Sequence, residues 1–170
     1  QQKKTRDFIT KFERNPDASG LNFERINDAA DAKMRSVRID KTYRAIIVHP
    51  PRGDVFVLGW VDHHDDAYAW ARRTESGVNP HNGAFQFFSR PVVGEASAAP
   101  APSERAGAVV QPRMFDGVDD EDLLFAGVPE PLMPSVRNVI TEPDLDALAP
   151  HLPEGVRDIL YALAAGYSIT

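Results

Sequence analysis

Residues 35–73 constrain the fold more than any other part of this chain, because very short connections join three apolar, strand-like segments there. Only two residues separate segments 35–40 and 43–49, and a Pro-Pro-Arg-Gly turn leads into segment 54–61. Proline presets φ and glycine tolerates positive φ, so this turn is a strong one. Connections this short can join only antiparallel neighbours. The stretch therefore predicts a three-stranded antiparallel meander.

The last two predicted strands are apolar on both alternating sets of positions, as residues 45–48 illustrate. A strand that is apolar on both faces is normally covered on both. Helices predicted at residues 3–14 and 65–73 are the available covers. A long turn at 77–83 then leads to a predicted fourth strand at 84–89. We therefore predict an α+β fold, in which helices flank an antiparallel sheet.

A stretch rich in proline and alanine divides the chain. We predict an α+β domain at 1–90, a linker at 91–113 and a small acidic helical segment at 114–170, where prolines separate short helices. A bundle of about 55 residues is marginal alone, so we expect it to dock on the first domain or on sequence beyond Thr170. The predicted helices span 119–125, 131–140, 142–148 and 153–166, and the predicted core residues are Leu145, Leu148, Leu152, Ile159, Leu160 and Leu163.

The composition excludes several kinds of site. The chain has no cysteine, which rules out disulfides and thiolate metal sites and fits a reducing cytoplasm. No apolar run approaches the roughly 18 residues of a membrane span, and the P-loop motif is missing. We therefore expect a cytoplasmic chain with no membrane partner, no cofactor and no bound metal. The chain starts at Gln1 without methionine, so we expect it to be part of a longer protein.

Charge is distributed unevenly along the chain. Residues 1–90 carry a net charge of +3 and residues 91–170 a net charge of −9. Two ordinary solvated surfaces would give this difference. A basic module that meets nucleic acid and is tethered to an acidic module would give it as well.

Four cationic side chains lie on or between the first two predicted strands. Arginine offers a planar fork that suits a phosphate group, so a hairpin with several cations suits a nucleic-acid backbone. The alternative is that these side chains are solvated and paired with Asp40 or Asp62. Trp70 could stack on a base, whereas Trp60 is expected in the core. The predicted nucleic-acid-binding residues are Arg35, Arg38, Lys41 and Arg44.

A His-His-Asp-Asp run at residues 63–66 follows the third predicted strand. Adjacent residues at a strand end point in opposite directions, so a metal ion would need a further ligand such as His49 or His81. We favour the interpretation that Asp65 or Asp66 caps the following helix. A third interpretation is acid–base chemistry, in which an imidazole would accept a proton near neutral pH.

The order of elements in residues 1–75 is a helix, a loop, a three-stranded meander and a polar cluster that opens a short helix. This order resembles the RelE/ParE toxin superfamily, which has arginines before the first strands, a Tyr-Arg pair opening the next strand, and a basic cluster and a tyrosine after the last. The resemblance implies a RelE-like α+β fold. The matching residues are Arg35, Arg38, Tyr43, Arg44, His63, His64 and Tyr68.

A narrower likeness covers most of the chain. The segments GLNFE at 20–24, RSVR at 35–38, Tyr-Arg at 43–44 and VDHHDDAYAWA at 61–71 are similar to the RelE-like domain at the N-terminus of certain bacterial UvrD-like helicases. In those proteins a proline-rich spacer and an acidic helical segment precede the ATPase core. The likeness implies an accessory region of a superfamily 1 DNA helicase. Its partners would be DNA or RNA, or the helicase core of the parent protein.

One departure from the family pattern concerns the reaction. Members that cleave RNA usually keep arginine or lysine after the third strand, where this chain has His64 and Asp65. An anionic Asp65 would repel a scissile phosphate. We therefore expect docking without toxin activity. The alternative is a RelE-type endoribonuclease, similar to an mRNA interferase, that uses His63 or His64 with Tyr68 and Arg44.

Overall fold

The chain folds as two compact units, Gln1–Glu75 and Ser76–Thr170. The computed structural model describes residues 2–15, 21, 23–49, 55–91 and 112–168. The turn predicted at 50–53 lies outside the described residues, as do residues 92–111 of the predicted linker. The division between the units falls before the strand predicted at 84–89, so that strand belongs to the second unit.

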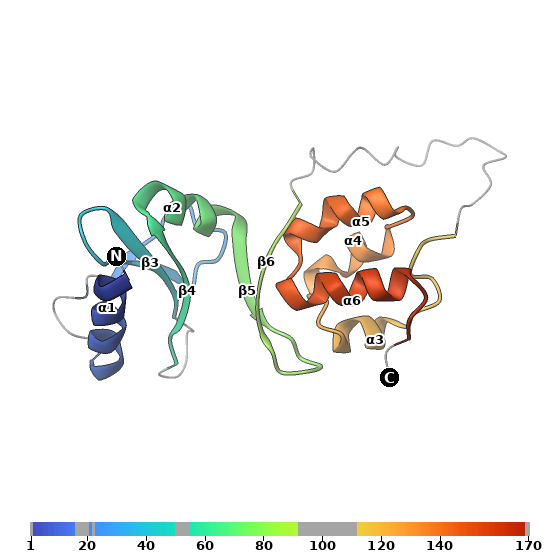
Figure 1. Cartoon of the computed structure of the whole chain (residues 1–170), viewed down its shortest axis with the longest axis horizontal. Coiled ribbons are helices and arrows are strands. Elements are labelled where there is room, and N and C mark those ends of the chain that lie inside the picture. Colours follow the sequence, from blue (N-terminus) through green and yellow to red (C-terminus); the bar gives the residue numbers. More distant parts are fainter. Residues whose placement is uncertain (1, 16–20, 22, 50–54, 92–111, 169–170) are drawn as a thin grey trace. The chain divides into compact units, whose positions relative to one another are not determined.

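The first unit is built on a four-stranded antiparallel sheet in the order β1-β2-β3-β4, of which Figure 1 labels β3 and β4. The strands are β1 (Phe23–Arg25), β2 (Met34–Arg38), β3 (Tyr43–Val48) and β4 (Val57–His63). The predicted meander is confirmed as β2, β3 and β4, each paired with the next. The fourth strand of this sheet is β1, which precedes the meander and pairs with β2.

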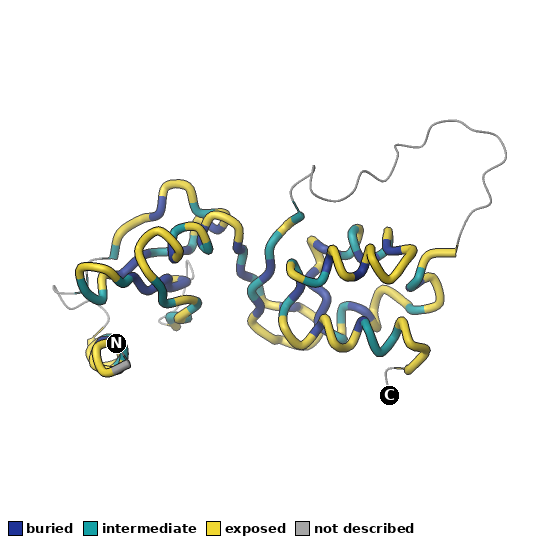
Figure 2. The backbone as a smooth tube through the Cα atoms, turned by 45° about the horizontal axis from the view of Figure 1, so that its top comes forward, coloured by how far each residue is buried: buried dark blue, intermediate teal, exposed yellow. Residues whose placement is uncertain are grey.

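Helix α1 (Gln2–Arg14) covers one face of the sheet. Its Phe8 is buried against Val37, Ala45 and Ile47, which alternation places on the same face of β2 and β3. The charged residues of α1 are exposed (Figure 2). The apolar stripe that predicted this helix is therefore the surface by which it binds the sheet.

Helix α2 (His64–Arg73) covers the opposite face. Ala67 and Ala71 are fully buried, and their small side chains allow the helix to approach the sheet closely. The hydroxyl of Tyr68 forms a 2.9 Å hydrogen bond with Oγ of Ser36, which lies on the face opposite Val37. The expectation that helices cover both faces of the meander is thus confirmed.

A bulge interrupts the pairing of β3 with β4. Ile46 pairs with Trp60, but Ile47 pairs with Leu58, so Gly59 is the extra residue. A bulge bends the strand and increases its local twist. Because Gly59 has no side chain, the extra residue adds no bulk to either face.

The prediction that Trp60 lies in the core is wrong. Its side chain is 42% exposed because β4 forms an edge of the sheet. The ring of Trp60 stacks on that of Trp70 from α2, with 5.7 Å between the centroids and 7° between the planes. Trp60 Nε1 also donates a 3.3 Å hydrogen bond to Asp62.

The second unit combines most of a two-stranded sheet with short helices. Strand β5 (Thr74–Val78), which begins two residues before the division between the units, pairs with β6 (Phe85–Ser89). The predicted strand at 84–89 therefore forms, but in a separate sheet, and β5 was not predicted. The helical elements are α3 (Asp120–Phe125), η1 (Glu130–Leu132), α4 (Met133–Arg137), α5 (Glu142–Leu148), η2 (Ala149–His151) and α6 (Glu154–Ala164).

The helices of the second unit are completed by the β5–β6 hairpin. Phe88 of β6 is buried in the helical core. Asn79 Nδ2 donates a 2.7 Å bond to the carbonyl of Leu124, and Gln86 Nε2 donates a 2.5 Å bond to that of Gly127. The hairpin thus supplies the surface that the small helical segment was expected to need.

The core of the second unit largely follows the prediction. Leu145, Leu148, Leu152 and Leu160 are buried, and Leu163 packs on them while partly exposed. Ile159 was expected in this core but is 36% exposed, so this part of the prediction is wrong. No helix in the described part of the chain is both long and apolar enough to cross a membrane.

Candidate nucleic-acid interface

The turn between β2 and β3 is held by Asp40. Its Oδ1 accepts hydrogen bonds from the backbone amides of Thr42 (2.8 Å) and Tyr43 (2.9 Å). A short acidic side chain that bonds the backbone two and three residues on stabilises a turn of this kind. These two amides, together with the ammonium of Lys4, lower the pKa of Asp40 to about 2. Asp40 is therefore an anion that fixes the shape of the hairpin tip.

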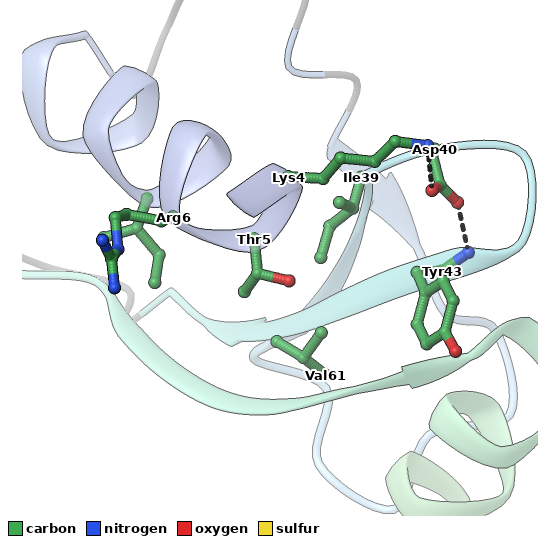
Figure 3. Close-up of a pocket in the computed structure, with 8 residues that line it drawn as sticks. Lys4, Thr5, Arg6, Ile39, Asp40, Tyr43 and Val61 are labelled. Carbon is green, nitrogen blue, oxygen red and sulfur yellow. Dashed lines mark hydrogen bonds and ion pairs between the residues drawn. The ribbon is translucent and has the colours of Figure 1, made fainter. Parts of the chain in front are cut away.

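Lys4 connects this turn to α1. Its Nζ lies 3.0 Å from Oδ2 of Asp40, a residue 36 positions away in sequence. Figure 3 shows the Lys4 side chain reaching from α1 to Asp40. The lysine side chain stays 67% exposed, so the ion pair contributes little to stability. What the Lys4–Asp40 contact shows is that the first turn of α1 lies beside the hairpin tip.

Four exposed cations lie on the elements that meet near this tip. Lys41 lies in the turn, and Arg38 ends β2 on the face that α2 covers. Lys4 and Arg6 come from α1 on the other face, where Lys4 reaches Asp40 and Arg6 lies at the opposite side of the pocket (Figure 3). Neither Arg38 nor Lys41 forms a hydrogen bond or ion pair with another residue that the structure describes. We call Lys4, Arg6, Arg38 and Lys41 the hairpin-tip cluster.

Two of the predicted cations lie elsewhere. Arg35 is an odd number of residues from Arg38, so alternation places it on the opposite face of β2, and its Nη1 donates 2.7 Å bonds to the carbonyls of Ala32 and Met34. The expectation that the four hairpin cations share one surface is therefore not met. Sequence reasoning also missed Lys4 and Arg6. Their only signal was the basic start of the first helix.

Arg44 is buried and braces the hairpin from inside. It is 5% exposed, and its Nη1 donates to the carbonyls of Asp40 (3.0 Å) and Tyr43 (3.1 Å). Its Nε has no hydrogen-bond partner among the described residues. Arg38 pairs directly opposite Arg44. Like charges in such a pair repel, and here one guanidinium turns to backbone carbonyls while the other faces solvent.

The two histidines lie on different faces of the first unit. His63 pairs with Tyr43 across the sheet, and Nε2 of His63 lies 2.8 Å from the Tyr43 hydroxyl. His64 begins α2 and stacks on Tyr68 with 4.5 Å between the ring centroids. The structure thus brings His64 and Tyr68 together and separates His63 from them.

The acidic residues after these histidines do not cap α2. The helix begins at His64, one residue earlier than predicted, so the N-cap position is His63, which makes no side-chain cap bond. Asp65 and Asp66 therefore lie inside the first turn, where their negative charge still interacts favourably with the helix dipole. Oδ1 of Asp65 lies 2.9 Å from Nδ1 of His64. No group of three or more metal-ligating side chains occurs in the part of the chain that the structure describes.

A pocket of about 640 Å³ lies between α1 and the hairpin. In Figure 3, Thr5 of α1 and Ile39 point into the space, and Tyr43 and Val61 lie on the strands below it. The pocket adjoins the hairpin-tip cluster, because Lys4 and Arg6 line it too. Its lining residues are Lys4, Thr5, Arg6, Ile9, Ile39, Asp40, Tyr43 and Val61.

Comparison of the chain with protein-family models, with curated proteins and with solved structures gave no match in any of the three. The α+β architecture, with a four-stranded antiparallel sheet, flanking helices and a C-terminal helical segment, is established by the structure.

Proposed function

We propose that residues Gln1–Glu75 dock on nucleic acid through the hairpin-tip cluster. The observation that carries this proposal is the 3.0 Å contact between Lys4 and Asp40, which places cations of two distant segments around one turn. Asp40 neutralises only one of these positive charges. A cluster of exposed like charges attracts a polyanion, and cationic side chains on an exposed turn suit phosphate contacts.

The sequence likeness suggests a host for this module. In a cytoplasmic UvrD-like helicase, it would be an accessory region that contacts DNA or RNA beside the motor domains. The second unit, Ser76–Thr170, carries a net charge of −8 and is unsuited to a polyanion. It is the better candidate for a protein partner, such as the helicase core of the same protein.

The alternative is a RelE-type endoribonuclease. The stacked pair of His64 and Tyr68 is the observation that favours it. Arg44, however, would have to break two bonds to backbone carbonyls before it could reach a phosphate, and the Tyr68 hydroxyl is bonded to Ser36. His63 lies on the other face of the sheet. These contacts make docking the better supported function.

The test is a titration of the whole chain with labelled single- and double-stranded oligonucleotides between 50 and 200 mM salt, with cleavage assayed on the same samples. Removal of two phosphate contacts by Arg38→Ala with Lys41→Ala should lower the steepness of log K against log salt by about 1.4 to 1.8. The matched control is Lys11→Ala with Arg14→Ala, which makes the same change in net charge at the other end of α1.

Affinity that does not depend on salt, or an equal loss in both double variants, would overturn the docking proposal. Cleavage of RNA that Tyr68→Phe abolishes would establish the ribonuclease instead.

A further inference from the structure

The pocket between α1 and the hairpin has the size and the chemistry of a ligand site. Its volume of about 640 Å³ falls within the range of roughly 300–1,000 Å³ that is typical of such sites. The side chains of Ile9, Ile39 and Val61 give it aliphatic walls, and Tyr43 adds an aromatic ring. A mostly apolar pocket with a few polar groups binds a flat or apolar group and orients it through those few contacts.

The polar groups of the pocket favour an anionic ligand. Lys4 and Arg6 both line it, and Asp40, the one acid among the described lining residues, already accepts two backbone bonds and the contact from Lys4. The hydroxyl of Thr5 points into the space (Figure 3) and can donate or accept a hydrogen bond. A flat group with hydrogen-bonding edges, attached to phosphates, matches this arrangement.

We infer that the pocket takes one unstacked base of a single-stranded nucleic acid, while Lys4 and Arg6 contact the flanking phosphates. The inference rests on the proposed docking function and adds the form of the polymer. A base in a duplex is stacked and paired, so it cannot enter a pocket unless it is first extruded, which costs the stacking and pairing energy. A single strand offers its bases without that cost, and the ring of Tyr43, which lines the pocket and is tilted against His63, is the aromatic surface that a base would contact.

The two tryptophans of the first unit, Trp60 and Trp70, are less suitable. They stack on each other with 7° between the ring planes, whereas the ring contact of Tyr43 with His63 is tilted by 43°. The carboxylate of Asp62 lies 3.3 Å from the indole nitrogen of Trp60 and would repel a nearby phosphate. The pocket, in contrast, is lined by the ring of Tyr43 together with the cations Lys4 and Arg6.

The experiment compares two strands of equal charge on the whole chain. A twelve-residue thymidine strand and a twelve-residue abasic strand carry the same phosphates, so only a base-binding site distinguishes them. The thymidine strand should bind about 5- to 100-fold more tightly, and more tightly than a twelve-base-pair duplex. Thr5→Phe should fill the pocket and abolish this preference. Thr10→Phe, an exposed change on the same helix, is the control and should keep the preference.

A cross-linking measurement keeps the test independent of any variant. A thymidine strand that carries 5-iodouracil should cross-link to Tyr43 on irradiation, as mapped by mass spectrometry. Cross-linking to Trp60 or Trp70 instead would overturn the inference. Equal binding of the thymidine and abasic strands, tighter binding of the duplex, or an unchanged preference in Thr5→Phe would overturn it too, while docking itself would stand. Absence of binding to every strand would overturn both proposals.

Discussion

Arg38 and Arg44 lie directly opposite each other on β2 and β3. We nevertheless expect that replacing Arg38 weakens nucleic-acid binding, whereas replacing Arg44 lowers the stability of the first unit. Arg38 is exposed and belongs to the hairpin-tip cluster, whereas Arg44 is 5% exposed and bonds two backbone carbonyls. The variants Arg38→Met and Arg44→Met remove the same charge and keep a similar apolar stem. Each is therefore the matched control of the other.

The stability change for Arg44→Met follows from its contacts. Hydrogen bonds from a charged group contribute about 1.5–3 kcal/mol each, and Arg44 donates two through Nη1. The variant also removes the cost of a buried charge whose Nε lacks a described partner, which offsets about 1–3 kcal/mol. The net loss is about 2 kcal/mol, or roughly 8–16 °C in Tm for a unit of this size. Arg38→Met is exposed and should change stability by less than about 0.5 kcal/mol.

Two measurements on the whole chain separate these outcomes. Both tryptophans of the chain, Trp60 and Trp70, lie in the first unit, so urea unfolding followed by their fluorescence reports on that unit alone. Fluorescence anisotropy with a labelled oligonucleotide reports on binding. Arg38→Met should weaken binding and lower the salt slope by about 0.7–0.9, whereas folded Arg44→Met should leave that slope unchanged. If Arg44→Met lowered the slope without loss of stability, the bracing role argued for Arg44 would be refuted.

Two further predictions concern Gly127 and Asp40. Gly127→Ala should destabilise the second unit by about 2–4 kcal/mol, because φ of Gly127 is +106° and a methyl group there would lie 3.0 Å from Val156 Cγ2. Gly117→Ala is the control: its methyl group would enter open space, so stability should change by less than about 0.5 kcal/mol. Urea unfolding followed by circular dichroism measures both. Equal effects of the two alanine variants would contradict this reason. The lowered pKa of Asp40 means that its stabilisation is fully present above about pH 4 and is lost as the pH falls through about 2. In urea unfolding followed by tryptophan fluorescence, Asp40→Asn should therefore be less stable than the original chain at pH 7 and should approach it near pH 2; a constant difference across this window would contradict the assignment.

The sequence predicted the meander and its two covering helices well, because their signals are local. Apolar residues on both faces of β3 require a cover on each side, and short turns leave only antiparallel pairing. Strand β1 has three residues, of which two are charged, so no alternation could identify it. Strand β5 has the sequence TESGV, which is too polar to predict a strand. Its partner β6 was therefore expected in the sheet of the meander, which is the wrong sheet.

The candidate site was predicted less completely, for a different reason. Arg35 and Arg38 were grouped because they are near in sequence, but alternation sends them to opposite faces. The burial of Arg44 depends on carbonyls that only the folded hairpin presents, and no local pattern encodes it. Lys4 meets Asp40 across 36 residues, so its part in the cluster follows from the packing of α1 rather than from any motif.

The bulge at Gly59 also affects whether copies of this chain can pair with one another through the edge of the sheet. Strand β4 is an edge of the sheet and exposes Leu58 and Trp60, which is the profile of a strand prone to pair with another molecule. An extra residue in the middle of such a strand breaks the even spacing of its amides and carbonyls, so a straight foreign strand cannot match them along its whole length. A single glycine thereby lets the edge keep its large apolar side chains without inviting aggregation.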